Sequence, residues 1–186
     1  MTKITQLAAV LGLFFANSAF AHQVQLNAAL PTVNVSKDGE LLAKGKTVTY
    51  KVWTSDGLAG KVRVVHHFAG RSSAKEKNEA LINAIKAANF DRSKYQTTSI
   101  INTDDAIVAT GAFVKSSAED GKLENPHSQV VLDQQGSVKN AWGLKAKDSF
   151  IAVLDKNGKV QFVAEGKLSA NQIQQVIALI HTLIAQ

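Results

Sequence analysis

One stretch of this chain lacks the alternation of a surface strand. Residues 61–68 read KVRVVHHF, a run dense in β-branched and aromatic side chains. A strand with one face in water alternates apolar and polar residues, whereas a strand covered on both faces does not. The run therefore predicts a buried central strand, in a sheet that other elements must cover on both faces.

Other stretches supply the partners of that strand. We expect strands at residues 48–54, 99–101, 128–133, 150–155 and 159–164, and a short hairpin formed by residues 32–35 and 40–42 around a Lys37-Asp38-Gly39 turn. Apolar residues at helical spacing predict helices through residues 80–88 and 173–184, and apolar residues at mixed spacing predict another at residues 106–114. This order predicts an α/β sandwich, with a central mixed sheet flanked by helices and an extra N-terminal β-hairpin.

Two helix starts carry capping signatures. Ser73 is followed by Glu76, and Ser169 by Gln172, so each pair has the spacing of a capping box. Leu168 and Ile173 are placed as a hydrophobic staple around the second start. Both patterns predict a helix that begins at the serine.

The first 21 residues have the three parts of a secretory signal peptide. Lys3 supplies a positive start, residues 7–15 an apolar segment, and residues 19–21 the A-x-A cleavage pattern. No later segment approaches the roughly 20 apolar residues that span a bilayer. We therefore expect residues 1–21 to be removed, and residues 22–186 to form a single domain located in the bacterial periplasm.

The 186-residue chain contains no cysteine, which excludes disulfides, thiolate nucleophiles and Cys-ligated metal centres. Its net charge is +6, and because Lys3 is the only charged residue among the first 21, residues 22–186 carry +5. The lysines are scattered rather than clustered and are not interleaved with aromatic residues, a pattern that disfavours nucleic-acid binding. A basic surface of this kind favours acidic or anionic partners, and no motif indicates a cofactor.

One local run resembles a known fold family. Residues 60–75, GKVRVVHHFAGRSSAK, are similar to the G-K-V-x-V-V-x-F-W-A-x-W-C-x-x-C run of periplasmic thioredoxin-like proteins. The closing hairpin and helix at residues 150–184 resemble the end of that fold. More closely, the His-His-Phe-Ala-Gly-Arg-Ser run and residues 141–144 (AWGL) resemble the YtfJ family of secreted, thioredoxin-like bacterial proteins, whose function is not established. The resemblance implies a fold and a compartment rather than an activity.

The departures from the thioredoxin pattern matter most for function. Ser72 and Lys75 stand where the family implies the two redox cysteines, and we call this pair the former redox position. The loop where the family implies a cis-proline reads Lys147-Asp148-Ser149. Because thiol–disulfide exchange needs a thiolate, that chemistry is excluded here. The remaining candidate binding residues form a polar rim at a helix N-terminus: Arg71, Ser72, Ser73, Lys75, Asp148 and Ser149.

We expect a binding or adaptor protein for a periplasmic protein or peptide, with no assigned catalytic residue or metal ligand. An alternative hypothesis is a non-redox enzyme, because Ser72 and Lys75 match the Ser-x-x-Lys spacing of a serine activated by lysine. A third is copper binding by His22, whose amine would be freed by signal cleavage, with His127 as a further ligand. His66 and His67 are adjacent in a strand, so they are expected on opposite faces as buried histidines that share no metal.

Overall fold

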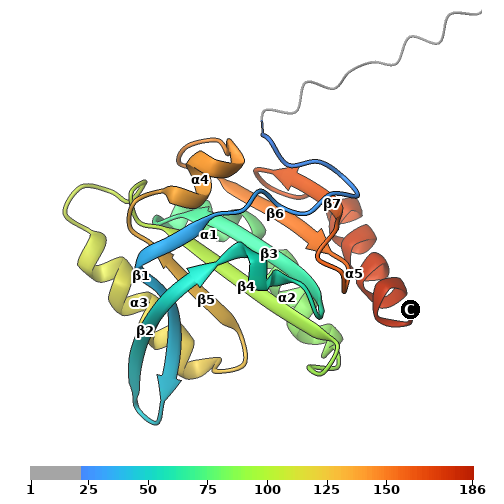
Figure 1. Ribbon diagram of the computed structural model, residues 1–186, viewed down its shortest axis with the longest axis horizontal. Coiled ribbons are helices and arrows are strands. Elements are labelled where there is room, and N and C mark those ends of the chain that lie inside the picture. Colours follow the sequence, from blue (N-terminus) through green and yellow to red (C-terminus); the bar gives the residue numbers. More distant parts are fainter. Residues whose placement is uncertain (1–21) are drawn as a thin grey trace, which may run out of the picture.

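The computed structural model describes residues 22–186, so the expected signal peptide lies outside the described residues (Figure 1). The described chain forms a mixed sheet of seven strands in the order β2-β1-β5-β4-β3-β6-β7. The strands are β1 (Asn34–Lys44), β2 (Thr47–Thr54), β3 (Val62–Ala69), β4 (Tyr95–Asn102), β5 (Gln129–Asp133), β6 (Ser149–Leu154) and β7 (Val160–Glu165). The helices are α1 (Ser72–Lys75), α2 (Glu79–Ala88), α3 (Gly111–Glu124), α4 (Ser137–Trp142) and α5 (Ala170–Ile184), with 3₁₀ turns η1 (Ser55–Leu58) and η2 (Glu76–Asn78).

The expected buried strand is β3, and every one of its side chains is buried. β3 pairs in parallel with β4 and antiparallel with β6, and β4 pairs in parallel with β5. β4 is therefore the middle strand of the sheet. This arrangement confirms the expected α/β fold with a central mixed sheet.

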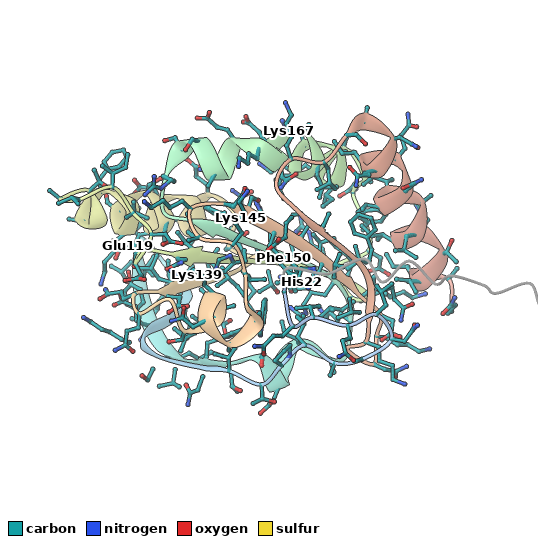
Figure 2. All side chains as sticks on the ribbon, turned by 90° about the horizontal axis from the view of Figure 1, so that it is seen from above. His22, Glu119, Lys139, Lys145, Phe150 and Lys167 are labelled. Atoms are coloured by element: carbon teal, nitrogen blue, oxygen red, sulfur yellow. The ribbon has the colours of Figure 1, made fainter. Side chains whose placement is uncertain are left out.

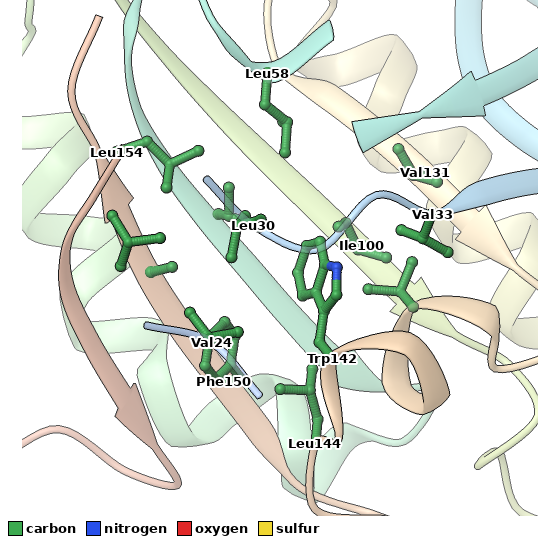
Figure 3. Packing of buried hydrophobic residues seen from close by; sticks show 14 of the residues in the cluster. Val24, Leu30, Val33, Leu58, Ile100, Val131, Trp142, Leu144, Phe150 and Leu154 are labelled. Atoms are coloured by element: carbon green, nitrogen blue, oxygen red, sulfur yellow. The ribbon is translucent and has the colours of Figure 1, made fainter. Parts of the chain in front are cut away.

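Alternate residues of β3 define the two faces of the sheet. Val64 packs with Leu81 of α2 and Ile180 of α5, so these helices cover one face. Val65 packs on the other face with Trp142 of α4 and with the segment before β1 (Figure 3). Trp142 is fully buried, and its indole N–H donates to the carbonyl oxygen of Pro31 at 2.8 Å. The N-terminal segment is thus part of the core.

The hairpin prediction placed the turn wrongly. Residues 37–39 lie inside the continuous strand β1, and the turn that joins β1 to β2 is at residues 45–46. The register of β1 on β2 shifts between Val35 and Glu40, and Asp38 and Gly39 have positive φ. They form a bulge whose backbone approaches Lys51 so closely that a Cβ at Gly39 would collide with the Lys51 carbonyl. A Lys-Asp-Gly sequence favours positive φ in a bulge as well as in a turn.

Two helix predictions also need correction. Residues 106–110 form a loop, and α3 runs instead from Gly111 to Glu124. The expected capping box at Ser73 is absent, because α1 begins at Ser72 with Arg71 as its N-cap and no side-chain cap. The capping box of Ser169 and Gln172 is confirmed. Among the described residues, no helix combines the length and the apolar character that a membrane span requires.

Candidate functional site

The former redox position lies at the start of α1, directly after β3. Ser72, Ser73 and Lys75 are exposed, and no hydrogen bond joins Ser72 to Lys75. Arg71 is half-buried and turns inward, where its Nε and Nη2 donate to the carbonyl oxygen of Asp105 at 2.9 and 2.6 Å. The guanidinium therefore fixes the loop after β4, while the two serines and Lys75 face solvent.

The loop before β6 faces the start of α1. The described residues contain no cis peptide bond, and Lys147 has a φ of 59° at the place where a cis-proline was implied. Asp148 is buried and forms ion pairs with Lys77 at 2.5 Å and Lys145 at 3.2 Å. Burial works against ionisation of Asp148, but hydrogen bonds from Lys77, the Ser149 backbone and Lys145 outweigh it and hold the carboxyl pKa below its usual value. Asp148 thus joins the loop to η2.

Ser149 is also buried rather than presented to solvent. Its Oγ lies 3.0 Å from Nε2 of His66 and 2.8 Å from the donating Nδ2 of Asn78. Burial, together with the nearby His67 and Lys75, lowers the pKa of His66 to about 3, so its imidazole is neutral. This network links the first residue of β6 to β3 and to the helical segment that begins at Ser72.

Asp105 ties the same region together, although no sequence motif marks it. Its carboxylate accepts from the backbone N–H of Lys147 at 2.9 Å, from Asn102 at 3.1 Å and from Lys139 at 3.0 Å. Burial opposes ionisation, but the bonds from Lys147 and Lys139 keep the carboxyl pKa below its usual value. Since its carbonyl also holds Arg71, Asp105 connects four segments of the chain.

A groove of about 950 Å³ begins at the former redox position and follows the middle of the sheet. Ser72 and Lys75 line one end, and Pro126 and His127 line the other. Its walls come from α2 and α3, and its floor comes mainly from β4. We call this feature the α2–α3 groove.

The floor of the α2–α3 groove carries hydroxyl groups. Thr97 and Ser99 of β4 project into it and are half-buried, and the Thr97 hydroxyl lies 3.0 Å from the Tyr95 hydroxyl. His66 and Phe68 line it from β3. The middle strand of a seven-stranded sheet normally carries apolar residues beneath its helices. Hydroxyls at this place are compatible with a face left open to solvent or to a ligand.

The α3 wall of the groove is built from small residues, Ser117, Ala118 and Gly121. A Cβ added at Gly121 would meet no atom within 4 Å, and the backbone there is an ordinary helix. Glycine inside a helix costs roughly 0.5–1 kcal/mol relative to alanine. No packing contact requires this glycine, and its lack of a side chain keeps the groove wide.

The histidines are distributed as the strand alternation predicts. His66 lines the α2–α3 groove, whereas His67 projects from the opposite face of β3, and both are buried. His22 packs edge-on against Phe150, with ring centroids 5.5 Å apart (Figure 2). Phe150 pairs with His67 near the end of β3, while exposed His127 precedes the start of β5. The structure therefore does not bring His22 and His127 together as copper ligands.

Within residues 22–186 there is no group of three or more His, Asp or Glu side chains arranged to hold a metal ion. The arrangement around Ser72 also gives this residue no hydrogen-bonded base. What the site offers is an open groove with many neutral hydrogen-bonding groups.

Solved structures with this fold include thiol–disulfide proteins. A putative protein disulfide isomerase from Bacteroides thetaiotaomicron superimposes with a TM-score of 0.58 at 16% identity, covering 89% of this chain and 93% of that one. A putative thiol:disulfide interchange protein DsbE from Chlorobium tepidum gives a TM-score of 0.58 at 15% identity, over 87% and 99% of the chains. At these identities the likeness establishes the thioredoxin-like fold alone.

Closer relatives establish the family. An uncharacterized protein of Haemophilus influenzae is 59% identical over 177 residues, which cover 95% of this chain and 96% of that protein. The uncharacterized protein YtfJ of Escherichia coli is 45% identical over 166 residues, covering 89% and 90%. The model of a family described as "Bacterial protein of unknown function (YtfJ_HI0045)" matches residues 24–183. The chain therefore belongs to the YtfJ family, as the His-His-Phe-Ala-Gly-Arg-Ser run indicated.

Proposed function

We propose that this chain is a non-redox binding protein of the bacterial periplasm, which holds an extended peptide segment of a partner protein in the α2–α3 groove. The observation that carries the proposal is the open face of β4, where Thr97 and Ser99 line a groove of about 950 Å³. A volume of this order is typical of ligand sites. The cysteine-free sequence removes redox chemistry from the same scaffold.

The lining favours a ligand without a large net charge. Three cationic and three acidic side chains balance one another along the groove: Lys75, Lys86, Arg92, Glu76, Glu79 and Glu124. Neutral hydrogen-bonding side chains, including Asn83, Gln96 and Ser117, lie among them. Such groups match the N–H and C=O groups of a peptide backbone, each of which needs a partner when it leaves water.

The mode of binding follows from the sheet order. β4 is paired on both sides, by β3 and β5, so a ligand cannot extend the sheet at this strand. A peptide in the groove is held instead by side chains from the floor and the two helices. Phe68, Ile82 and Ile101 provide apolar surface along the groove for the side chains of the peptide.

Photocrosslinking in living cells tests this proposal. A photoreactive residue replaces Ser72, at the mouth of the groove, and a control probe replaces exposed Lys156 in the turn between β6 and β7. The proposal predicts a discrete protein adduct from position 72 that is absent from position 156. It also predicts recovery of the protein in the periplasmic fraction without residues 1–21. A correctly localised protein that gives no adduct at position 72 would overturn the binding role.

Two variants distinguish peptide binding in the groove from catalysis at Ser72 and Lys75. Lys75→Ala removes the group that the enzyme hypothesis needs as a base, whereas Ser117→Trp fills the groove from its other wall. The binding proposal predicts that Ser117→Trp abolishes the adduct from position 72 and that Lys75→Ala leaves it in place. Loss of cellular function in Lys75→Ala with the adduct intact would favour an enzyme.

A further inference from the structure

Three large apolar side chains are exposed together where β4 leads into α3. Ile107 and Val108 belong to the connecting loop and are 58% and 93% exposed, and Phe113 in the first turn of α3 is 74% exposed. We call these three residues the apolar tip. The loop projects at one end of the molecule (Figure 1). Single exposed apolar residues are ordinary, but a protruding group of three marks a candidate interaction site.

Hydrogen bonds close the turn that carries Ile107 and Val108. The carbonyl oxygen of Ile107 accepts hydrogen bonds from the Thr110 N–H at 3.0 Å and the Thr110 hydroxyl at 2.7 Å. Ala109 between them has a φ of 69°, which closes the turn tightly. At the base of the loop, Asp105 is fixed by Lys139 and Lys147. Because the turn is already ordered, docking the tip would require little loss of conformational entropy.

Exposed positive charge lies at the same end of the sheet as the apolar tip, where β4 ends. Lys145 and Lys147 are exposed in the loop before β6, and Lys167 is exposed in the loop after β7; Figure 2 labels Lys145 and Lys167. Of the acidic side chains that pair with lysines here, Asp105 and Asp148 are only 9% and 7% exposed, whereas Asp104 is 51% exposed and Lys145 68%. The charge presented to solvent by these loops is therefore mainly positive, in keeping with the +5 of residues 22–186.

We propose that this end of the sheet docks on a membrane surface that contains anionic phospholipid, with the apolar tip entering the interface and the three lysines at the headgroups. The tip protrudes, a shape suited to inserting between lipids, and the lysines on the loops at the same end of the sheet supply the charge complementarity. This site is separate from the α2–α3 groove and does not depend on the proposed peptide binding. Its combination of one small apolar element and several lysines predicts reversible rather than permanent attachment.

Flotation with lipid vesicles tests the proposal, using residues 22–186, which comprise the whole described fold. We expect binding to vesicles of phosphatidylcholine mixed with phosphatidylglycerol, and little binding to phosphatidylcholine alone. The double variant Val108→Asp/Phe113→Asp should lower the partition coefficient by at least roughly tenfold, since it removes two of the three inserting groups. Leu26→Asp is the control, because Leu26 is 52% exposed beside the start of β7, at the opposite end of the sheet from the tip.

Substitutions of the lysines test whether positive charge contributes to binding of the anionic vesicles. Lys147→Gln and Lys167→Gln should each weaken binding to the anionic vesicles by about fivefold, and added salt should weaken it further. Lys156→Gln, in the β6–β7 turn, should have little effect. Thermal melts of each variant confirm that the fold is kept.

Three results would overturn the membrane proposal. One is no binding of the unaltered chain to anionic vesicles, and another is unchanged binding of the folded Val108→Asp/Phe113→Asp variant. The third is equal binding to both kinds of vesicle. If vesicle binding fails while a photoreactive residue at Val108 captures one protein in cells, the tip docks on a protein instead.

Discussion

Replacing Gly121 with alanine is predicted to stabilise the fold. A Cβ at this position meets nothing within 4 Å, so no packing cost offsets the gain in helix propensity. Relieving a helical glycine contributes roughly 0.5–1 kcal/mol. For a domain of this size that corresponds to a rise of about 1–4 °C in Tm. Thermal unfolding followed by circular dichroism, together with urea denaturation, measures both quantities.

Gly166 provides the matched control for this prediction. A Cβ added there also meets nothing within 4 Å, but its φ of +77° is a conformation that side chains disfavour. Gly166→Ala should therefore lower stability by about 1–2 kcal/mol, opposite in sign to Gly121→Ala. A Gly121→Ala protein that melts at or below the temperature of the parent would refute the reasoning, because it would mean that the small wall of α3 is required by the fold itself.

Three further predictions concern the buried polar groups and the core. Asp105→Asn should lower the free energy of unfolding by roughly 1.5–3 kcal/mol at pH 7, through loss of charge-assisted bonds. Because the pKa of Asp105 is depressed in the folded protein, the stability difference between the parent and Asp105→Asn should shrink as the pH falls through that pKa. A difference that stays constant in urea titrations from pH 7 to pH 3 would contradict this. His67 has an unpartnered Nε2, and burial lowers its pKa from 6.5 to about 4. Because the unfolded chain binds a proton at this residue at a higher pH than the folded protein does, the free energy of unfolding should fall as the pH drops from 6.5 towards 4. His67→Leu should abolish that loss, and a large deficit of the variant at pH 8 would show that the imidazole is needed for packing. Trp142→Phe should cost about 2–4 kcal/mol in chemical denaturation, since it opens space in the core and leaves the Pro31 carbonyl without its donor; a cost near zero would show that the contact adds little.

Sequence patterns were sufficient where one local signal dominated. β3 was predicted because residues 61–68 are dense in β-branched and aromatic side chains, and the structure buries every side chain of Val62–Ala69. α5 was identified from the cap at Ser169 and the periodic apolar residues that follow, and both are present. In these segments local preference and tertiary packing favour the same structure.

Other segments were misjudged because tertiary pairing decided between two local outcomes. Asp38 and Gly39 suit a turn, yet β5 pairs with β1 across these residues and keeps the strand continuous. The apolar residues among 106–114 predicted a helix, but residues 106–110 form a loop, and Ile107, Val108 and Phe113 are exposed. α4 has only six residues and follows Gly136 in a left-handed conformation, which is too short for a periodic signal.

The candidate site was only partly accessible from sequence. The substitution of both cysteines by Ser72 and Lys75 was plain, and it located one end of the groove. The inward turn of Arg71 towards Asp105 depends on contacts between residues 34 positions apart. The α2–α3 groove depends on where two helices lie relative to β4, and no local motif encodes that spacing. Thr97 and Ser99 were the available signal, as hydroxyls at alternate positions of the middle strand.

The central claim is that the α2–α3 groove holds the ligand, and the most direct measurement compares two substitutions of one residue. A photoreactive residue at position 72 is combined with Gly121→Ala or with Gly121→Trp, neither of which meets a neighbouring atom at Cβ. The account predicts that the protein adduct persists with alanine and disappears with tryptophan, while both proteins remain folded. An adduct that survives Gly121→Trp unchanged would contradict the account and place the ligand elsewhere.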